Sequence, residues 1–476
     1  MKQLRKTKIV GTIGPASENK LEELFKAGLN VCRINYSHGS WDEQSEKSET
    51  IMRLREELDL PIPMLLDMKG PEIRTGMLYT GKNTKIQLKD GQKFTLVNED
   101  ITGDEEKVSV TYKELYKDVK PGTKILIDDG AIELKVDEIV GKDIVTTVVH
   151  GNGLGSRKTM NLPGTIIRLP GLAEKDIADL KTACEHDYDF VAISFARNAE
   201  DINNVRKVLD ENGGKDIKII TKVENVEGLQ NLDNIIDLAD AQMIARGDMA
   251  TETDFTEPPV VQKRIIKACN DASKPAITAT QMLESMTHQP LPTRAEASDV
   301  ANAIYDRTSA IMLSGECAQG DYPVECVQTM VKIANRVEPE INYWKRFDEK
   351  QPVLNTFEDK VAYSACVSAK ILNADAIVCY THTGNTARNL SGLGAGCPIL
   401  AITDNKRTFR QLALAWNVTP IYVEAGENID KTIEAGIKKL QNKEILEKGD
   451  VVVITGGSQM LPDEEQSKTI NGIMKI

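Results

Sequence analysis

The alternation of short apolar strands with longer helical patterns limits the fold of this chain more than any other feature of its sequence. The strand-like windows end in polar residues or Gly, and most of them start roughly two to three dozen residues apart. That spacing suits one strand plus one return helix, and eight such units close a TIM (β/α)8 barrel. The predicted barrel strands begin near Lys8, Asn30, Ile62, Phe190, Lys218, Ala241, Pro275 and Ser309.

The interval after the third window breaks this rhythm. It is longer than the others by roughly a hundred residues, which is the size of a small domain. It contains short strands joined by Gly turns, such as KIQLKDGQKFTLV and KILIDDGAIELKV. We expect an all-β domain at residues 71–168, inserted in a βα loop and therefore placed as a lid over the catalytic face of the barrel.

A second β/α set begins after about Pro339. Its strand-like runs are AIVCYT, PILAIT, TPIYV and DVVVITGG, with helical patterns between them. This alternation predicts a separate C-terminal α/β domain with a doubly wound sheet at residues 340–476. The barrel itself is then built from residues 1–70 and 169–339.

Composition excludes several classes of function. The net charge of -13 over 476 residues would repel nucleic acid and anionic lipid, so neither is an expected partner. The scattered cysteines show no metal-binding spacing, which favours reduced, buried thiols. No window approaches the roughly 18 apolar residues of a membrane span, and the N-terminus lacks an apolar signal region. We therefore expect a cytoplasmic protein.

Charged and polar residues gather at the C-terminal ends of four predicted barrel strands. Because strand side chains alternate faces, residues two apart point to the same side. A structural salt-bridge network is one interpretation of any single position. Only one end of a TIM barrel carries catalysis, however, so charged and polar residues at the same end of four strands favour an active site. The sets that share a face are Arg33, Asn35 and Ser37; Asp67 and Lys69; Lys222 and Glu224; and Arg246 and Asp248.

Two of these carboxylates suggest a metal site. Neighbouring strands lie about 4.8 Å apart, so Glu224 and Asp248 can share a cation, and their all-oxygen chemistry suits Mg²⁺ or Mn²⁺. The positive charge of Lys222 can stabilise a phosphoryl group in transfer. Asn35, Ser37 and Asp67 form a second oxygen-rich set that suits K⁺, although on these residues alone a plain hydrogen-bond network is the favoured interpretation.

Several long motifs resemble the pyruvate kinase family, in its bacterial form. They are RKTKIVGTIGPAS, INYSHG, LLDMKGPEIRTG, ITKVENVEG, IARGD and ITATQMLESM, and they occur in the family's order over nearly the whole chain. The resemblance implies transfer of a phosphoryl group from phosphoenolpyruvate to ADP, giving pyruvate and ATP as the last step of glycolysis. It also implies a divalent ion, K⁺ and a homotetramer.

The resemblance assigns roles by position. Glu224 and Asp248 correspond to the divalent-ion ligands, and the Gly247 and Asp248 amides face the substrate carboxylate. Lys222, assisted by Arg33, stabilises the moving phosphoryl group, and Thr280 helps to protonate the enolate. The implied K⁺ ligands are Asn35, Ser37, Asp67 and the Met68 carbonyl, and the residues implied near the nucleotide are Asn35, His38, Arg74 and Lys158.

The chain departs from the family pattern at a few positions. Met68 replaces the usual Thr, which a carbonyl ligand tolerates. Ala250 and the segment TETDFTEPP replace the usual run after IARGD, so substrate affinity or lid closure should differ. Arg307 and Cys317 are further changes, and none of them removes a proposed catalytic side chain.

A turn in the C-terminal domain is a candidate phosphate site for a phosphosugar effector. Its hydroxyl and amide groups precede a predicted helix, where phosphate binding and ordinary N-capping are both compatible with the residues. The acidic tail SQMLPDEEQSK opposes an anionic effector. The residues of the turn are Thr381, Thr383, Gly384, Asn385 and Thr386.

Two other functions fit parts of the pattern. A metal-dependent aldolase would also use paired carboxylates, but it would need neither Lys222 nor the lid. A catalytically silent metabolite sensor would have no reason to keep three charges around an ion. An assay of pyruvate formation separates these readings.

Overall fold

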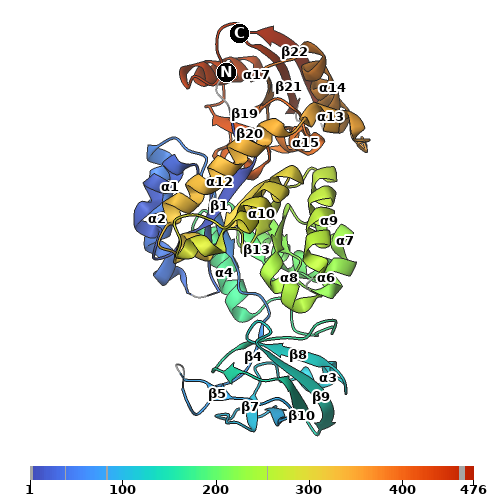
Figure 1. Cartoon of the computed structure of the whole chain (residues 1–476). Coiled ribbons are helices and arrows are strands. Elements are labelled where there is room, and N and C mark those ends of the chain that lie inside the picture. The colour runs from blue at the N-terminus through green and yellow to red at the C-terminus, as the bar shows by residue number, and fades with distance from the viewer. Residues whose placement is uncertain (1–3, 38, 82–83, 255, 460–466) are drawn as a thin grey trace.

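The computed structural model describes residues 4–37, 39–81, 84–254, 256–459 and 467–476. Three bodies are arranged in line, with the barrel in the middle, the lid at one end and the C-terminal sheet at the other (Figure 1). No helix in the described parts of the chain is both long and apolar enough to cross a bilayer.

The central body is a closed barrel of eight parallel strands, as predicted. Its strand order is β1-β17-β16-β15-β14-β13-β3-β2. Strands β3 and β13 pair directly, with Leu65 opposite Phe190, although the whole lid lies between them in the chain. The strands are β1 Lys8–Thr12, β2 Val31–Asn35, β3 Met64–Asp67, β13 Phe190–Ile193, β14 Lys218–Lys222, β15 Ala241–Ala245, β16 Ala276–Ala279 and β17 Ala310–Leu313.

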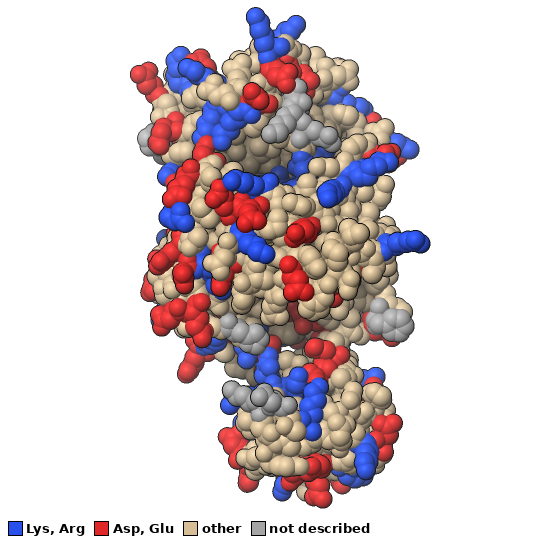
Figure 2. Space-filling view, turned by 60° about the vertical axis from the view of Figure 1, so that its left-hand side comes forward, with Lys and Arg blue, Asp and Glu red and all other residues tan. Residues whose placement is uncertain are grey.

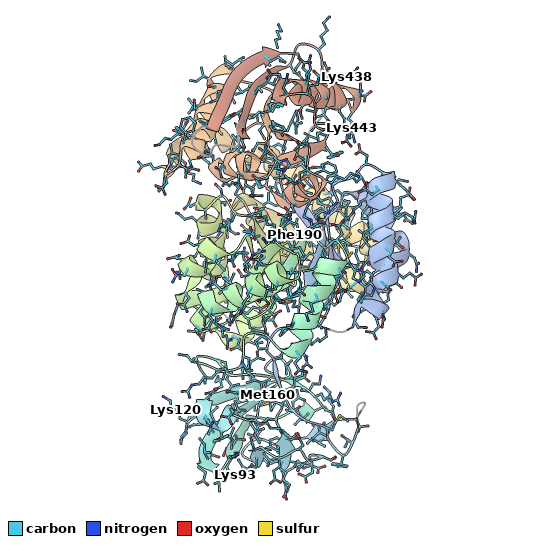
Figure 3. The ribbon with its side chains drawn as sticks, turned by 180° about the vertical axis from the view of Figure 1, so that it is seen from behind. Lys93, Lys120, Met160, Phe190, Lys438 and Lys443 are labelled. Atoms are coloured by element: carbon cyan, nitrogen blue, oxygen red, sulfur yellow. The ribbon has the colours of Figure 1, made fainter. Side chains whose placement is uncertain are left out.

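The barrel strands are buried on both faces. Alternate residues, among them Val10, Leu65, Ile220 and Met243, form one apolar cluster inside the barrel, while the residues between them pack outward against the helices. Toward the C-terminal ends the inward positions become polar, with Arg33, Asp67 and Lys222 following the apolar layers. Figure 3 shows Phe190 within the barrel body.

Helices surround the barrel, and their ends follow local sequence signals. Ser40 and Glu43 form a capping box on α2, Asn198 caps α5, and Pro258 occupies the first turn of α9. The helices of this body are α1 Leu21–Ala27, α2 Trp41–Glu57, α4 Glu174–Glu185, α5 Ala199–Glu211, α6 Val226–Gln230, α7 Leu232–Leu238, α8 Arg246–Glu252, α9 Glu257–Asp271, α10 Arg294–Tyr305, α11 Gly315–Ala318 and α12 Pro323–Val337.

The lid is built on a seven-stranded sheet of order β4-β12-β8-β9-β10-β6-β7, with β11 and β5 as a separate pair. It also contains one short helix, α3 Leu115–Asp118, which the all-β prediction did not include. A narrow waist joins it to the barrel (Figure 2), and Lys93 lies at the end of the lid farther from the barrel (Figure 3). Its strands are β4 Ile73–Arg74, β5 Ile86–Gln87, β6 Lys93–Val97, β7 Lys107–Ser109, β8 Lys124–Ile127, β9 Ile132–Val140, β10 Asp143–His150, β11 Gly153–Leu154 and β12 Thr159–Asn161.

The C-terminal sheet has the order β20-β19-β18-β21-β22. Separate apolar clusters cover its two faces, which confirms a doubly wound domain. The sequence analysis missed β22, which runs antiparallel to β21 at the edge. The strands are β18 Ala376–Tyr380, β19 Ile399–Thr403, β20 Val418–Tyr422, β21 Val451–Gln459 and β22 Ser467–Lys475, and the helices are α13 Tyr343–Glu349, α14 Phe357–Leu372, α15 Asn385–Leu393, α16 Lys406–Gln411 and α17 Ile429–Asn442.

The C-terminal domain closes the N-terminal end of the barrel. Leu414, in the 3-10 helix Leu412–Leu414, belongs to the apolar cluster inside the barrel. Lys8 Nζ, at the same end, donates a hydrogen bond to the Val418 carbonyl at 2.6 Å. The exact limits of the three domains stay a prediction.

Candidate active site

A charged layer lies at the C-terminal mouth of the barrel, above the apolar layers. Arg33 Nε donates to Asp67 Oδ2 at 2.7 Å, and its Nη1 donates to Thr12 Oγ1 at 2.7 Å. Lys222 Nζ lies 3.2 Å from Asp67 Oδ1 and 3.6 Å from Glu224 Oε1. The period-two pattern therefore does bring Arg33, Asp67, Lys222 and Glu224 together, from strands β2, β3 and β14 and the residues that follow β14.

Burial and charge act against each other in this layer. Burial disfavours the charged form of Lys222, yet Asp67, Glu224 and Asp248 outweigh it and raise the pKa of the ammonium above its ordinary value. Burial would also raise the pKa of Asp67, but Lys222 and Arg33 hold it below its ordinary value. Both groups are therefore charged at neutral pH.

Glu224 behaves differently from Asp67. It is fully buried, and burial together with Asp248 raises its pKa to about 8, although Lys222 opposes the shift. Its Oε2 accepts the Phe195 N–H at 2.7 Å, but Oε1 is enclosed and has no hydrogen-bond partner among the described residues. A buried carboxylate oxygen without a donor is costly unless a cation satisfies it.

Asp248 and Arg246 are not on a strand, which corrects the sequence analysis. β15 ends at Ala245, and Arg246–Glu252 form helix α8. Arg246 turns away from Asp248, because its Nη1 binds Asp299 Oδ2 at 2.6 Å. Helix residues two apart do not share a face.

The exposed Asp248 still belongs to the mouth. It is close enough to shift the pKa of both Lys222 and Glu224. Its carboxylate has no hydrogen bond or ion pair with any other described residue.

The oxygen atoms at the mouth fit a divalent ion of the magnesium type. Glu224 supplies Oε1, which accepts no hydrogen bond and lies 3.6 Å from Lys222 Nζ, and Asp248 supplies a free carboxylate. Within the described ranges no cluster of three or more His, Cys, Asp or Glu side chains is spaced to hold a metal. Mg²⁺ commonly takes only one or two protein carboxylates and fills its other positions with water and substrate oxygens, so two ligands are sufficient.

The four residues assigned to K⁺ meet at the ends of β2 and β3. Asn35 and Asp67 are register partners across these strands. Asn35 Oδ1 accepts the Ser37 N–H at 3.0 Å, and the Met68 carbonyl accepts the Ser194 hydroxyl at 2.7 Å. Each of these two oxygens keeps a second lone pair, so the set is compatible both with a monovalent cation and with the hydrogen-bond network now present.

Thr280 follows the end of β16 in a left-handed conformation, with φ 67°. Its hydroxyl donates to the Ala279 carbonyl at 2.7 Å and accepts the Gly247 N–H at 2.9 Å. The Gly247 amide, assigned to the substrate carboxylate, is thus held by Thr280. A β-branched residue with positive φ is rare and clusters at functional sites.

Two of the residues assigned to the nucleotide, Arg74 and Lys158, lie in the lid, whereas Asn35 ends barrel strand β2. Arg74 Nε donates to Glu72 Oε2 at 2.8 Å, and its Nη1 donates to the Arg157 carbonyl at 3.0 Å. Lys158 Nζ donates to Asp128 Oδ1 at 2.7 Å. His38 lies outside the described residues. Arg74 and Lys158 are therefore on the same body but each has a carboxylate partner of its own.

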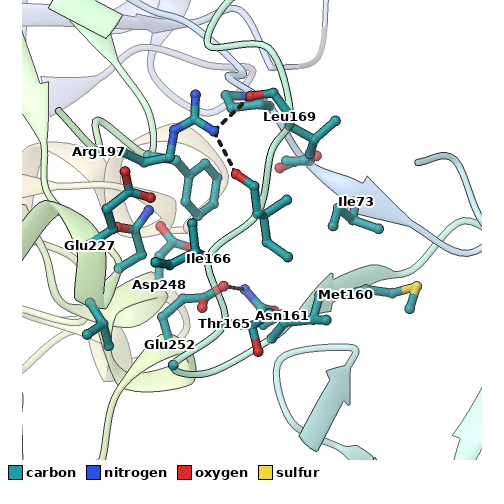
Figure 4. Close-up of a pocket in the computed structure, with 18 of the residues that line it drawn as sticks. Ile73, Met160, Asn161, Thr165, Ile166, Leu169, Arg197, Glu227, Asp248 and Glu252 are labelled. Atoms are coloured by element: carbon teal, nitrogen blue, oxygen red, sulfur yellow. Dashed lines mark hydrogen bonds between the residues drawn. The ribbon is translucent and has the colours of Figure 1, made fainter. Parts of the chain in front are cut away.

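A cavity of about 190 Å³ separates the lid from the mouth (Figure 4). Asn161 of the lid donates to Glu252 of α8 at 2.8 Å across it, and Arg197 Nη1 donates to the Ile167 and Leu169 carbonyls at 3.0 and 2.8 Å. Sequence reasoning missed Asn161 and Arg197, because neither lies in a strand pattern that ends at the mouth, and it noted Glu252 only as part of the altered segment after Asp248.

The candidate effector turn precedes helix α15. Gly384 has φ 85°, and its N–H binds Thr381 Oγ1 at 2.9 Å. Arg388 donates to Asn385 Oδ1 and to the Thr383 carbonyl. Residues 460–466, which make up most of the acidic tail, lie outside the described residues.

Comparison with known proteins shows the family to which this chain belongs. The family model for the pyruvate kinase barrel domain matches residues 4–327, and the model for the pyruvate kinase alpha/beta domain matches residues 359–474. The chain belongs to the pyruvate kinase family. Its known reaction is the glycolytic transfer of the phosphoryl group of phosphoenolpyruvate to ADP, so the chain is a phosphotransferase.

Individual pyruvate kinases support the assignment. The enzyme of Clostridium acetobutylicum is 46% identical over 95% of this chain and 96% of that protein. The enzyme of Clostridium perfringens is 45% identical over 97% of this chain and 100% of that protein. A crystal structure of a pyruvate kinase from Cryptosporidium parvum has a TM-score of 0.91 and 35% identity, covering 98% of this chain and 96% of that one.

Proposed function

We propose that the mouth of the barrel performs the pyruvate kinase reaction with Lys222 as the residue that meets the moving phosphoryl group. The observation that carries this proposal is the enclosed Lys222 ammonium, which Asp67, Glu224 and Asp248 keep charged. A fixed positive charge in a dry site stabilises charge that develops in the transition state. Phosphoryl transfer passes through a loose transition state that needs positioning and electrostatics above all.

The divalent ion, Mg²⁺ or Mn²⁺, would be held by Glu224 and Asp248. When bound, it neutralises negative charge on the phosphoryl and carboxylate oxygens of the substrate. Glu224 Oε1, which accepts no hydrogen bond, and the free Asp248 carboxylate are available as ligands for this ion.

The remaining residues orient the reactants. Arg33, anchored by Asp67 and Thr12, adds a second positive charge beside Lys222. ADP attacks phosphorus in line, the phosphorus–oxygen bond of phosphoenolpyruvate breaks, and that electron pair leaves with the enolate of pyruvate. A proton then reaches the enolate carbon with help from the Thr280 hydroxyl, while the Gly247 and Asp248 amides hold the carboxylate.

K⁺ and the nucleotide complete the proposed site. Asn35, Ser37, Asp67 and the Met68 carbonyl would bind K⁺. Asn35, His38, Arg74 and Lys158 would lie along the ADP phosphates when the lid closes. Glu72 contacts Arg74 in this structure. The resemblance implies K⁺ dependence here, because family members that carry Glu at this position require K⁺.

The finer biological setting is also a proposal. We infer a cytoplasmic homotetramer, with a candidate phosphosugar site at Thr381, Thr383, Gly384, Asn385 and Thr386. An unchanged phosphoenolpyruvate saturation curve on adding fructose 1,6-bisphosphate would reject that effector.

An assay of pyruvate formation from phosphoenolpyruvate and ADP tests the whole proposal. We expect activity to require Mg²⁺ or Mn²⁺ and to rise when K⁺ replaces Na⁺ at constant ionic strength. Equal turnover with and without K⁺ would exclude the proposed K⁺ site but leave the role of Lys222 intact. No pyruvate under any of these conditions would refute the function.

A further inference from the structure

A second cavity, of about 870 Å³, lies between the barrel and the C-terminal domain, at the end of the barrel opposite the mouth. It is bordered by the end of α9, the turn at Arg307, helix α13 and the segment that follows, and the end of α15. Neither the proposed catalytic residues nor the candidate effector turn line it.

Two cations converge inside this cavity on one carbonyl oxygen. Arg307 Nη2 and Lys350 Nζ both donate to the Gly392 carbonyl, at 2.6 and 2.9 Å. Arg307 also lies over the Trp416 ring, with Cζ 5.2 Å from the ring centroid. Like charges this close repel each other, and Arg307 indeed lowers the pKa of Lys350 further below the value that burial alone gives.

The carboxylates that line the cavity are already engaged. Asp271 pairs with Lys267 at 2.7 Å and with Lys350 at 3.1 Å. Asp306 pairs with Lys263, Glu349 with Lys345, and Asp359 accepts hydrogen bonds from the Thr356 N–H and Asn389. Arg307 and Arg346 both line the cavity, and neither forms an ion pair with any described residue.

Arg307 is also held in an unusual way. Its backbone has φ 66°, in the left-handed region that favours glycine. Its Nη1 occupies the space where Gly394 would carry a side chain, because a Cβ on Gly394 would come within 2.0 Å of that atom. The strained backbone of Arg307 and the missing side chain at Gly394 together allow this guanidinium to lie against the C-terminal domain.

Hydrogen-bond donors remain free around the same point. Arg307 Nε is enclosed and has no partner in the described structure. The hydroxyl of the buried Tyr343, which also lines the cavity, has none either. Burial lowers the pKa of the Arg307 guanidinium to about 10, which an anion would reverse.

We propose that this cavity is a binding site for a small oxyanion, a phosphate monoester or a carboxylate, held by Arg307 and Lys350 with Tyr343 as a further donor. An arginine with free N–H groups beside a lysine is the pairing that proteins use for such anions. This proposal stands apart from the phosphotransferase activity, because none of its residues belongs to the mouth.

Calorimetric titration of the full chain tests the site, with inorganic phosphate and succinate as separate probes at constant ionic strength and without Mg²⁺ or nucleotide. We expect at least one probe to bind, and we expect Arg307→Gly and Lys350→Gln each to weaken that binding about tenfold or more. Glycine suits φ 66°, so Arg307→Gly should fold. Lys350→Gln provides a second variant that leaves the strained turn unchanged.

A control separates this cavity from other places where phosphate can bind. Arg264→Gln removes an exposed arginine from α9, the helix whose end borders the cavity. This variant should bind the probe as the unchanged chain does. Identical binding curves in the unchanged chain, Arg307→Gly and Lys350→Gln for both probes, or no binding of either probe, would overturn the proposal.

Discussion

The charged residues inside the barrel differ in how the surrounding structure treats them. At the mouth, Lys222 has carboxylates on several sides and stays charged. At the opposite end, Lys8 is buried with one carbonyl acceptor, and burial, reinforced by Arg5 and Lys6, lowers its pKa to about 7. The same side chain is thus used as a fixed cation at one end of the barrel and is poised to lose its proton at the other.

Lys8 gives a pH-dependent prediction about stability. An unfolded lysine binds its proton up to about pH 10.4, so between pH 7 and that value the unfolded state holds more protons at this position than the folded state. The free energy of unfolding therefore increases as pH rises through this window, because buried Lys8 destabilises the folded state less at higher pH. We expect Lys8→Met to raise the thermal midpoint more at pH 7 than at pH 9.5. An equal shift at both pH values in thermal melts would contradict this.

At the scale of elements, the link between the lid and helix α8 should control access to the mouth. Asn161 of β12 and Glu252 of α8 form a hydrogen bond beside the cavity, and burial raises the pKa of Glu252 above its ordinary value. Glu252 belongs to the altered segment after Asp248, where the sequence suggested a change in lid closure.

Removal of this link should loosen the contact between the lid and helix α8. We expect Asn161→Ala and Glu252→Ala to lower kcat/KM for phosphoenolpyruvate and ADP roughly tenfold, the value of one hydrogen bond to a charged group. Glu252→Gln keeps an acceptor and should lose less. Steady-state kinetics at fixed Mg²⁺ provide the measurement, and wild-type values in both alanine variants would show that the contact has no role in closure.

Elements were predictable where burial imposes a pattern. The eight barrel strands begin within a few residues of the predicted positions because inward and outward faces are both apolar. Helix α8 was mistaken for a continuation of β15, since the run ARGD has no signal that separates a strand end from a first helical turn. Strand β22 was missed because an antiparallel edge strand with polar residues such as Lys468 and Asn471 has no strong apolar pattern.

The same physics explains which site residues the sequence could predict. Arg33, Asp67 and Lys222 follow from alternation on short strands, and Glu224 continues the alternation two residues past the end of β14. Contacts such as Asn161 with Glu252 depend on how the lid is oriented over the barrel, and no local pattern encodes that orientation.

At the scale of the whole molecule, a buried ion network joins the barrel to the C-terminal domain. Asp189 is fully enclosed, accepts Arg410 Nε at 2.7 Å and lies 3.4 Å from Arg55 Nη1. Asp187 adds contacts to Arg55 and Arg407 at 2.7 and 2.8 Å. Removing one partner of such a network leaves buried charges without compensation.

We expect Asp189→Ala to destabilise the protein by about 3–5 kcal/mol. Arg410 and Arg55 would then lose their buried carboxylate partner, and the two domains would lose one buried polar contact. Asp210→Ala, at an exposed position of α5, is the matched control. Denaturant or thermal unfolding measures the difference, and a midpoint equal to that of Asp210→Ala would argue against a structural role for the network.

The central claim is that Lys222 at the barrel mouth stabilises the phosphoryl group in transfer. Pyruvate formation by Lys222→Met tests it most directly, beside Lys218→Met, which alters the same strand at a position paired with Asp240. With folding of both variants checked by thermal melts, we predict that Lys222→Met loses at least about a hundredfold in kcat and that Lys218→Met stays near the wild-type value. Activity of Lys222→Met close to that of the unchanged chain would contradict the assigned role.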